Sequence, residues 1–130
     1  MVEKPNVIAI VEDDPSVRDA LDLMLSFLGF QTELYASAEE FISAARMSEA
    51  TCLLVDIQLG DISGVEMAHQ LCAIGCYFPI IFMTGSHDEI LQRQAMETGC
   101  VAFLHKPFPE DQLVESIKKA TGSIPDRLLN

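Results

Sequence analysis

The chain has 130 residues, of which 49% are hydrophobic and 22% charged, a composition that predicts a single globular domain and excludes intrinsic disorder. Twenty acidic against eight basic residues give a formal net charge of −12, so we expect the surface to repel nucleic acid and anionic lipid and to attract cations and basic protein faces. The sequence has neither an apolar stretch of about 20 residues nor a secretory leader pattern, which predicts a soluble, cytoplasmic protein without membrane contact.

Two kinds of hydrophobic pattern alternate along the chain. Runs of four or five apolar residues are typical of strands covered on both faces, and apolar residues at every third or fourth position are typical of half-buried helices. Serine-led capping boxes and glycines mark where helices start and stop. In chain order, these patterns predict strand 7–11, helix 17–28, strand 31–35, a helix of about ten residues from 37, strand 52–55, a similar helix from 63, strand 80–83, helix 88–98, strand 101–104 and helix 109–119.

The alternation of strand and helix predicts the fold class. Five repeats require right-handed crossovers, which indicates an α/β protein with a doubly wound, five-stranded parallel sheet and five helices. Segment 31–35 alternates polar and apolar residues, as an edge strand does. Helix 88–98 has a thin apolar stripe and is expected to be loosely held. We assign residues 1–121 to one domain and residues 122–130 to a C-terminal tail with no partner segment.

The cysteines are predicted to be small, buried hydrophobic residues because they lie in apolar segments and form no CxxC pair. Two of them are one helical turn apart, but two thiols without a third ligand make a poor metal site. The four residues are Cys52, Cys72, Cys76 and Cys100.

Polar side chains follow four of the five predicted strands. Glu12 and Asp13 follow the first strand, Asp56 the third, Thr84 the fourth and Lys106 the fifth. In a doubly wound sheet, ligands bind beyond the carboxyl ends of the strands. Carboxylates that converge there repel one another unless a cation compensates them, and oxygen ligands favour Mg²⁺. A lysine at the same rim can pair with a carboxylate or neutralise charge on a transferred phosphoryl group.

Simpler roles stay open for each of these residues. Aspartates at strand ends often form turns or cap helices, and Asp14, directly before Pro15, is predicted to cap the first helix. An ordinary salt bridge would account for Lys106. A threonine after a strand carries no chemistry by itself.

The strand ends carry four motifs in a fixed order, and together these resemble the receiver domain of bacterial two-component response regulators, of the FixJ type. The resemblance spans residues 6–121 and implies a flavodoxin-like sheet with strand order 2-1-3-4-5. The spacings are 43 residues from Asp13 to Asp56, 28 on to Thr84 and 22 more to Lys106. The motifs are Val11-Glu12-Asp13-Asp14, Leu54-Val55-Asp56, Met83-Thr84-Gly85 and Lys106-Pro107-Phe108.

The resemblance implies a role for each residue of the cluster. Asp56 would accept a phosphoryl group from a histidine of a sensor kinase or phosphotransfer protein in a Mg²⁺-dependent reaction. Asp13 and Asp56 would bind Mg²⁺ directly, Glu12 mainly through water, and the backbone carbonyl of Gln58 would add a ligand. Lys106 would bind a phosphoryl oxygen. The protein would then supply position and electrostatics rather than acid–base chemistry.

The same resemblance implies a conformational switch. Thr84 would move toward the phosphate and the ring of Phe103 would turn inward, although Phe103 as an ordinary core residue stays open. The domain would signal to a downstream effector protein and could form a homodimer when phosphorylated. It would not bind nucleic acid directly. It would not be an enzyme, but would assist its own phosphorylation and dephosphorylation. The Lys106-Pro107 peptide bond is expected to be cis.

The chain departs from the family pattern in two places. Many receivers have Met-Pro after the phosphorylated strand, where this chain has Leu59-Gly60, so we expect the loop containing Asp61 and Ile62 to be more mobile. The first acidic residue is Glu12 rather than the commoner aspartate.

Three other functions fit parts of the sequence less well. A haloacid-dehalogenase-like phosphatase would need an aspartate two residues beyond Asp56, where this chain has Gln58. A flavin-binding module would need a Ser/Thr/Gly-rich phosphate loop after the first strand. This chain has acidic residues there, which would repel a phosphate. A degenerate receiver would have lost part of the acidic cluster or the lysine, and none is missing.

Overall fold

The computed structural model describes residues 6–128, which form a three-layer α/β fold. Five parallel strands form one sheet in the order β2-β1-β3-β4-β5, so the predicted fold class and strand order are confirmed. The elements in chain order are β1 (Val7–Val11), α1 (Pro15–Phe27), β2 (Gln31–Tyr35), α2 (Ala38–Ala44), β3 (Cys52–Asp56), α3 (Gly64–Ala73), β4 (Ile80–Thr84), α4 (Glu89–Glu97), β5 (Ala102–His105), α5 (Glu110–Thr121) and the 3₁₀ turn η1 (Asp126–Leu128).

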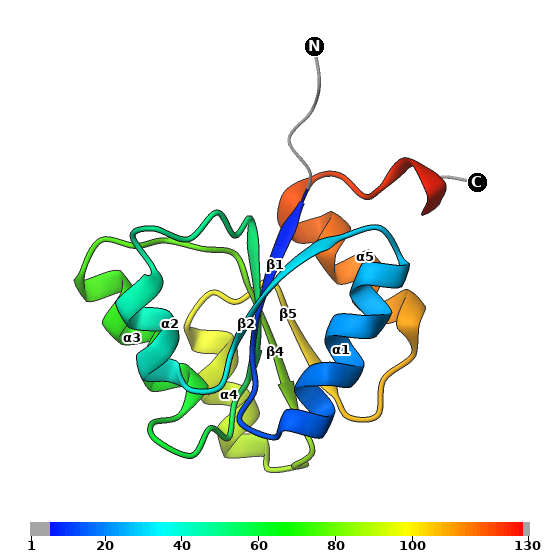
Figure 1. Cartoon of the computed structure of the whole chain (residues 1–130). Coiled ribbons are helices and arrows are strands. Elements are labelled where there is room, and N and C mark those ends of the chain that lie inside the picture. Colours follow the sequence, from blue (N-terminus) through cyan, green and yellow to red (C-terminus); the bar gives the residue numbers. More distant parts are fainter. Residues whose placement is uncertain (1–5, 129–130) are drawn as a thin grey trace.

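The sheet separates two hydrophobic cores because successive residues of a strand point to opposite faces. In β1, Ile8 and Ile10 pack with buried residues of α1 and α5, whereas Ala9 and Val11 pack with those of α2, α3 and α4. Figure 1 shows the same division, with α1 and α5 on one side of the sheet and the other three helices on the opposite side. Every residue of β1 and β3 is buried, as the continuous apolar runs predicted, and β2 lies at an edge.

Local signals set the ends of most elements. The side chains of Asp14 and Asp88 accept N–H bonds at the starts of α1 and α4, and Ser37 and Ser63 do so for α2 and α3. The cap predicted for Asp14 is therefore confirmed. Gly29, at the end of α1, has a φ of 100°, which favours glycine there. Strands β3, β4 and β5 each end one residue later than predicted.

Several packing predictions were wrong. Of the four cysteines only Cys52 is buried; Cys72 is exposed because the buried face of α3 consists of Met67, Ala68 and Leu71. Helix α2 has seven residues rather than about ten. Arg46 and Met47, just beyond its end, are exposed.

The start of the predicted tail has a partner, contrary to expectation. Ile124 and Leu128 pack against the core formed with α1 and α5. Asn6, before β1, donates a side-chain hydrogen bond of 2.8 Å to the carbonyl of Ser123. Between residues 6 and 128, none of the helices is long and apolar enough to cross a membrane.

Candidate functional site

Three carboxylates meet at the carboxyl ends of β1 and β3. Val11 of β1 pairs with Val55 of β3, so the next residues, Glu12 and Asp56, lie side by side. One carboxylate oxygen each from Glu12, Asp13 and Asp56 lies within 4.8 Å of the others. Glu12 and Asp56 are only 1% and 6% exposed, whereas Asp13 is open to solvent. These residues form a half-open acidic cluster at the end of the sheet where ligands of this fold class bind.

Lys106 directly follows β5, which is separated from β3 by β4, and its side chain reaches both buried carboxylates. Its Nζ lies 3.0 Å from Oε2 of Glu12 and 2.8 Å from Oδ2 of Asp56, and it donates a hydrogen bond to each. The backbone N–H of Lys106 donates to the carbonyl of Thr84 over 2.7 Å and so extends the pairing of β5 with β4. The following bond, Lys106-Pro107, is cis, as expected. The lysine is thus held by its main chain and by both carboxylates.

One ammonium group does not balance this much negative charge. Burial and the neighbouring Asp56 together raise the pKa of Glu12 to about 7, against the opposing effect of Lys106. The pKa of Lys106 is raised because its hydrogen bonds to the two carboxylates outweigh the opposing effect of burial. A divalent cation would favour the ionised form of Glu12. The donor set, made of hard carboxylate oxygens with one exposed member, therefore fits Mg²⁺ with several of its waters retained.

Backbone groups hold Asp56 and Thr84 in place. The N–H of Gln58 donates to Oδ1 of Asp56 over 2.8 Å, so each oxygen of this carboxylate has a partner. Thr84 is fully buried, and its hydroxyl accepts a hydrogen bond of 3.0 Å from the N–H of Ser86. Its position at the last residue of β4 places it in the strand between the one ending at Asp56 and the one preceding Lys106.

Phe103 lies on β5 opposite Phe82 of β4 and packs, partly exposed, against the core formed with α2, α3 and α4. Its ring meets the ring of His105 edge to face, with a centroid separation of 5.3 Å. His105 in turn stacks on His87 of the loop after β4, with ring centroids 5.0 Å apart. Sequence reasoning missed this stack, because nothing local in the sequence brings two residues 18 positions apart together.

Two other contacts had no sequence signal strong enough to find them. Arg18, in the first turn of α1, donates to the backbone carbonyl of Glu12 over 2.9 Å and so braces the end of β1. Asp61 accepts hydrogen bonds from the backbone N–H groups of Ala38 and Glu39, at the start of α2. The loop after β3, predicted to be mobile, is therefore fastened to a neighbouring helix.

The first residue of α3 packs directly beneath the strand that ends in Asp56. A Cβ built on Gly64 would lie 3.0 Å from the carbonyl oxygen of Asp56 and 3.1 Å from a ring atom of Phe82. We expect Gly64→Ala to lower the free energy of unfolding by about 1–3 kcal/mol, because backbone and a buried ring must move to make room. Urea denaturation measures this change. Gly85→Ala is the control, since nothing lies within 4 Å of its built Cβ, and a change as large there would contradict the steric explanation.

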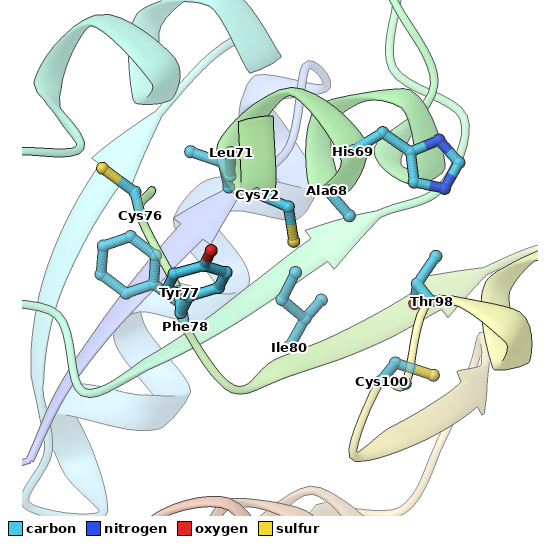
Figure 2. A pocket seen from close by; sticks show the side chains of 11 residues that line it. Ala68, His69, Leu71, Cys72, Cys76, Tyr77, Phe78, Ile80, Thr98 and Cys100 are labelled. Atoms are coloured by element: carbon cyan, nitrogen blue, oxygen red, sulfur yellow. The ribbon is translucent and has the colours of Figure 1, made fainter. Parts of the chain in front are cut away.

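A separate hollow of about 170 Å³ lies at the opposite end of the sheet (Figure 2). It is bounded by the end of α3 and by the segments that lead into β4 and β5, and Cys72, Cys76 and Cys100 are among its lining residues. Within residues 6–128, the acidic cluster is the only group of three or more His, Cys, Asp or Glu side chains close enough to share a metal ion. The thiols around this hollow are not part of such a group.

Comparisons with known proteins agree with this arrangement. The family model of the response regulator receiver domain matches residues 8–118. The response regulator protein TodT of Pseudomonas putida is 32% identical over 130 residues, covering all of this chain and 57% of that protein. The transcriptional regulatory protein FixJ of Bradyrhizobium diazoefficiens is 34% identical over 113 residues, covering 87% of this chain and 55% of FixJ. The chain thus spans little more than half the length of these relatives.

Solved structures show the same relationship in three dimensions. The crystal structure of FixJ-N superposes with a TM-score of 0.86 at 32% identity, covering 95% of this chain and 98% of that one. A receiver domain protein from Methanospirillum hungatei superposes with a TM-score of 0.83 at 26% identity, covering 92% of this chain and 95% of its own. On the matched family model, the parallel sheet and the relatives, this chain belongs to the response regulator receiver domain family of two-component signalling systems.

Proposed function

We propose that this domain accepts a phosphoryl group on Asp56 from a histidine of a sensor kinase or phosphotransfer protein, with Mg²⁺ as cofactor. The observation that carries the proposal is the bridge that Lys106 makes between Glu12 and Asp56, with Asp13 beside them. Three carboxylates and one ammonium leave a net negative site with room for a divalent cation. The buried, fixed Asp56 oxygens are the group to which a phosphoryl group would be transferred.

In this proposal Asp13 and Asp56 bind Mg²⁺ directly, Glu12 acts mainly through water and the backbone carbonyl of Gln58 supplies a further ligand. When bound, the ion offsets the negative charge that approaches with the phosphoryl group. A carboxylate oxygen of Asp56 attacks phosphorus in line, a P–O bond forms and the P–N bond to the donor histidine breaks. The protein contributes position and charge compensation.

Lys106 has a second partner available once Asp56 is phosphorylated. Its Nζ now bonds a carboxylate oxygen on each side, and a phosphoryl group on Asp56 would offer it anionic oxygens in place of the Oδ2 contact. The hold of Glu12 on the same ammonium keeps the lysine at the site during this exchange. Lys106 therefore stabilises the phosphorylated form without having to enter from solvent.

The proposed response involves Thr84 and Phe103. Thr84 would move toward the phosphate and the partly exposed ring of Phe103 would turn inward. Ala95 is the one buried residue of α4, so this helix can shift at small cost in buried area. The surface formed by α4, β5 and α5 would then engage an effector protein or a second copy of the domain. We assign residues 1–121 to this cytoplasmic signalling domain and 122–130 to a C-terminal tail in which Ile124 and Leu128 pack against the domain core. The domain would make no direct contacts with nucleic acid.

The proposal is tested by incubating the full chain with acetyl phosphate, with and without Mg²⁺, and measuring the intact mass. We expect one added phosphoryl group that depends on Mg²⁺. Asp13→Asn is expected to raise the Mg²⁺ concentration needed for half-maximal labelling by at least about tenfold, since even outer-shell changes at metal sites cost this much. Its neighbour Asp14 caps α1 through Ser16, and Asp14→Asn is the matched control because asparagine caps as well.

Two results would contradict the proposal. The first is phosphorylation that is the same with and without Mg²⁺. The second is an equal change in the Mg²⁺ requirement of Asp13→Asn and Asp14→Asn. Either result would contradict the proposed role of Asp13 in binding Mg²⁺. Continuous release of phosphate from simple phosphate esters would instead favour a hydrolase that uses Asp56 as nucleophile. Gln58 argues against that second function, because its amide cannot serve as the general acid.

A further inference from the structure

The loop between β3 and α3 is tied to the neighbouring helix α2 by one side chain. Oδ1 of Asp61 accepts a hydrogen bond from the N–H of Ala38 over 3.3 Å, and Oδ2 accepts one from the N–H of Glu39 over 3.0 Å. The two residues are 22 and 23 positions from Asp61 in the sequence. These bonds lower the pKa of Asp61 although burial opposes them, so this carboxylate stays charged at neutral pH.

Helix α2 also has hydrogen bonds of its own at its start. The hydroxyl of Ser37 accepts a hydrogen bond of 3.1 Å from the N–H of Glu40, and the carboxylate of Glu40 accepts one of 3.1 Å from the N–H of Ala36. The first bond is the N-cap bond of a capping box, while the carboxylate of Glu40 reaches back to the residue before the N-cap. The contacts of Asp61 are therefore additional, and their distinctive effect is on the loop that carries Asp61.

That loop forms one wall of the acidic cluster. The N–H of Gln58 donates to Asp56, and Gly60 lies so close to Asp13 that a Cβ on it would be 3.3 Å from Oδ2 of that residue. Residues 58 and 60 thus contact two of the three cluster carboxylates, and Asp61 follows directly. A shift of the loop would change the space around Asp13 and the hydrogen bond to Asp56 together.

The composition of the loop explains why the hydrogen bonds of Asp61 are needed to hold it in place. The loop contains Gly60, and glycine loses more conformational freedom on ordering than any other residue. A carboxylate that binds two backbone N–H groups of a packed helix compensates for that freedom. Ile62, on the other side of Asp61, packs partly buried against the core that contains α2 and α3.

We propose that Asp61 is a positioning residue that sets Mg²⁺ affinity and phosphorylation rate by holding the loop after β3 against the acidic cluster. This inference rests on the proposed function, because it concerns the same Mg²⁺ site. Among the described residues, no hydrogen bond or ion pair joins the side chain of Asp61 to the cluster carboxylates or to Lys106. Its effect passes through the backbone from Asp61 to Gly60 and Gln58.

The test compares Asp61→Ala, Asp61→Asn and Ser37→Ala in the full chain. Mg²⁺ binding is measured by titration calorimetry and phosphorylation by the rate of mass gain with acetyl phosphate. Outer-shell partners of metal ligands change affinity by about 10–100-fold, and we expect the lower end, about tenfold weaker binding, for Asp61→Ala. Asp61→Asn keeps one of the two acceptor oxygens and is expected to recover part of the affinity. Ser37→Ala removes a cap from the same helix and should leave Mg²⁺ affinity unchanged.

Each outcome separates one explanation from another. Wild-type affinity in Asp61→Ala would overturn the inference while leaving the proposed function intact. Equal losses in Asp61→Asn and Asp61→Ala would point to the charge of the carboxylate rather than its hydrogen bonds, and an equal loss in Ser37→Ala would point to the stability of α2; both would overturn it. A wild-type chain that neither binds Mg²⁺ nor gains a phosphoryl group would instead refute the proposed function.

Discussion

Asp56→Asn is expected to abolish phosphorylation by acetyl phosphate while leaving the chain folded. An amide is too weak a nucleophile to accept the phosphoryl group, so the gain in mass should disappear. The fold should persist because Lys106 keeps its bond to Glu12, and no buried charge is left without a partner. The loss of stability should therefore stay well below the roughly 3–5 kcal/mol that follows when a buried ion pair loses one member and strands the other.

The same substitution should relax the acidic cluster. Asp56 is one of the groups that raise the pKa of Glu12, so this pKa should fall below its value of about 7 when the second carboxylate is removed. Urea denaturation in chelator-containing buffer measures the stability, and NMR titration of Glu12 measures its pKa. Undiminished labelling of the variant would place the acceptor elsewhere. An unfolded variant would mean that Asp56 is chiefly a structural ion-pair partner.

The fold could be predicted from the sequence because its signals are local. Continuous apolar runs mark β1 and β3 as strands with helices on both faces, and the alternation in β2 marks it as an edge. The polar residues at the site could be predicted for a related reason. Parallel strands bring all their carboxyl ends to one edge, so a residue such as Lys106, 50 positions after Asp56, is placed near it by topology.

What could not be predicted depends on side-chain direction or on contacts between distant segments. Cys72 is one residue past the buried face of α3, an error of a single step in helical phase. Asp61 looks like a loop residue because its partners belong to a helix that starts 23 positions earlier. Ile124 and Leu128 form too short a pattern to reveal that they pack against the core. That Lys106 donates one hydrogen bond to Glu12 and another to Asp56 likewise could not be predicted from the sequence.

Lys106→Met is expected to destabilise the fold in a pH-dependent way in Mg²⁺-free buffer. The substitution leaves Glu12 and Asp56 as adjacent buried carboxylates, and stranding a buried charge costs roughly 3–5 kcal/mol. Lys106 now opposes the rise in the pKa of Glu12, so its removal should raise this pKa above the wild-type value of about 7. The folded variant then takes up a proton that the unfolded chain, with an ordinary pKa of 4.5, does not. Stability is therefore greatest at acidic pH and falls as the pH rises through the folded-state pKa.

The measurement is the free energy of unfolding in urea at about pH 6 and about pH 8, with chelator or with Mg²⁺. The deficit of Lys106→Met should be larger at the higher pH and should shrink when Mg²⁺ binds the two carboxylates. Lys119→Met is the matched control, because Lys119 is an exposed lysine in the last turn of α5 whose loss should cost at most about 1 kcal/mol. A deficit that is equal at both pH values and unaffected by Mg²⁺ would mean that Lys106 stabilises the fold through packing of its aliphatic chain. The Glu12 and Asp56 carboxylates would then not repel each other strongly, and this repulsion is the reason why we expect the acidic cluster to bind a cation.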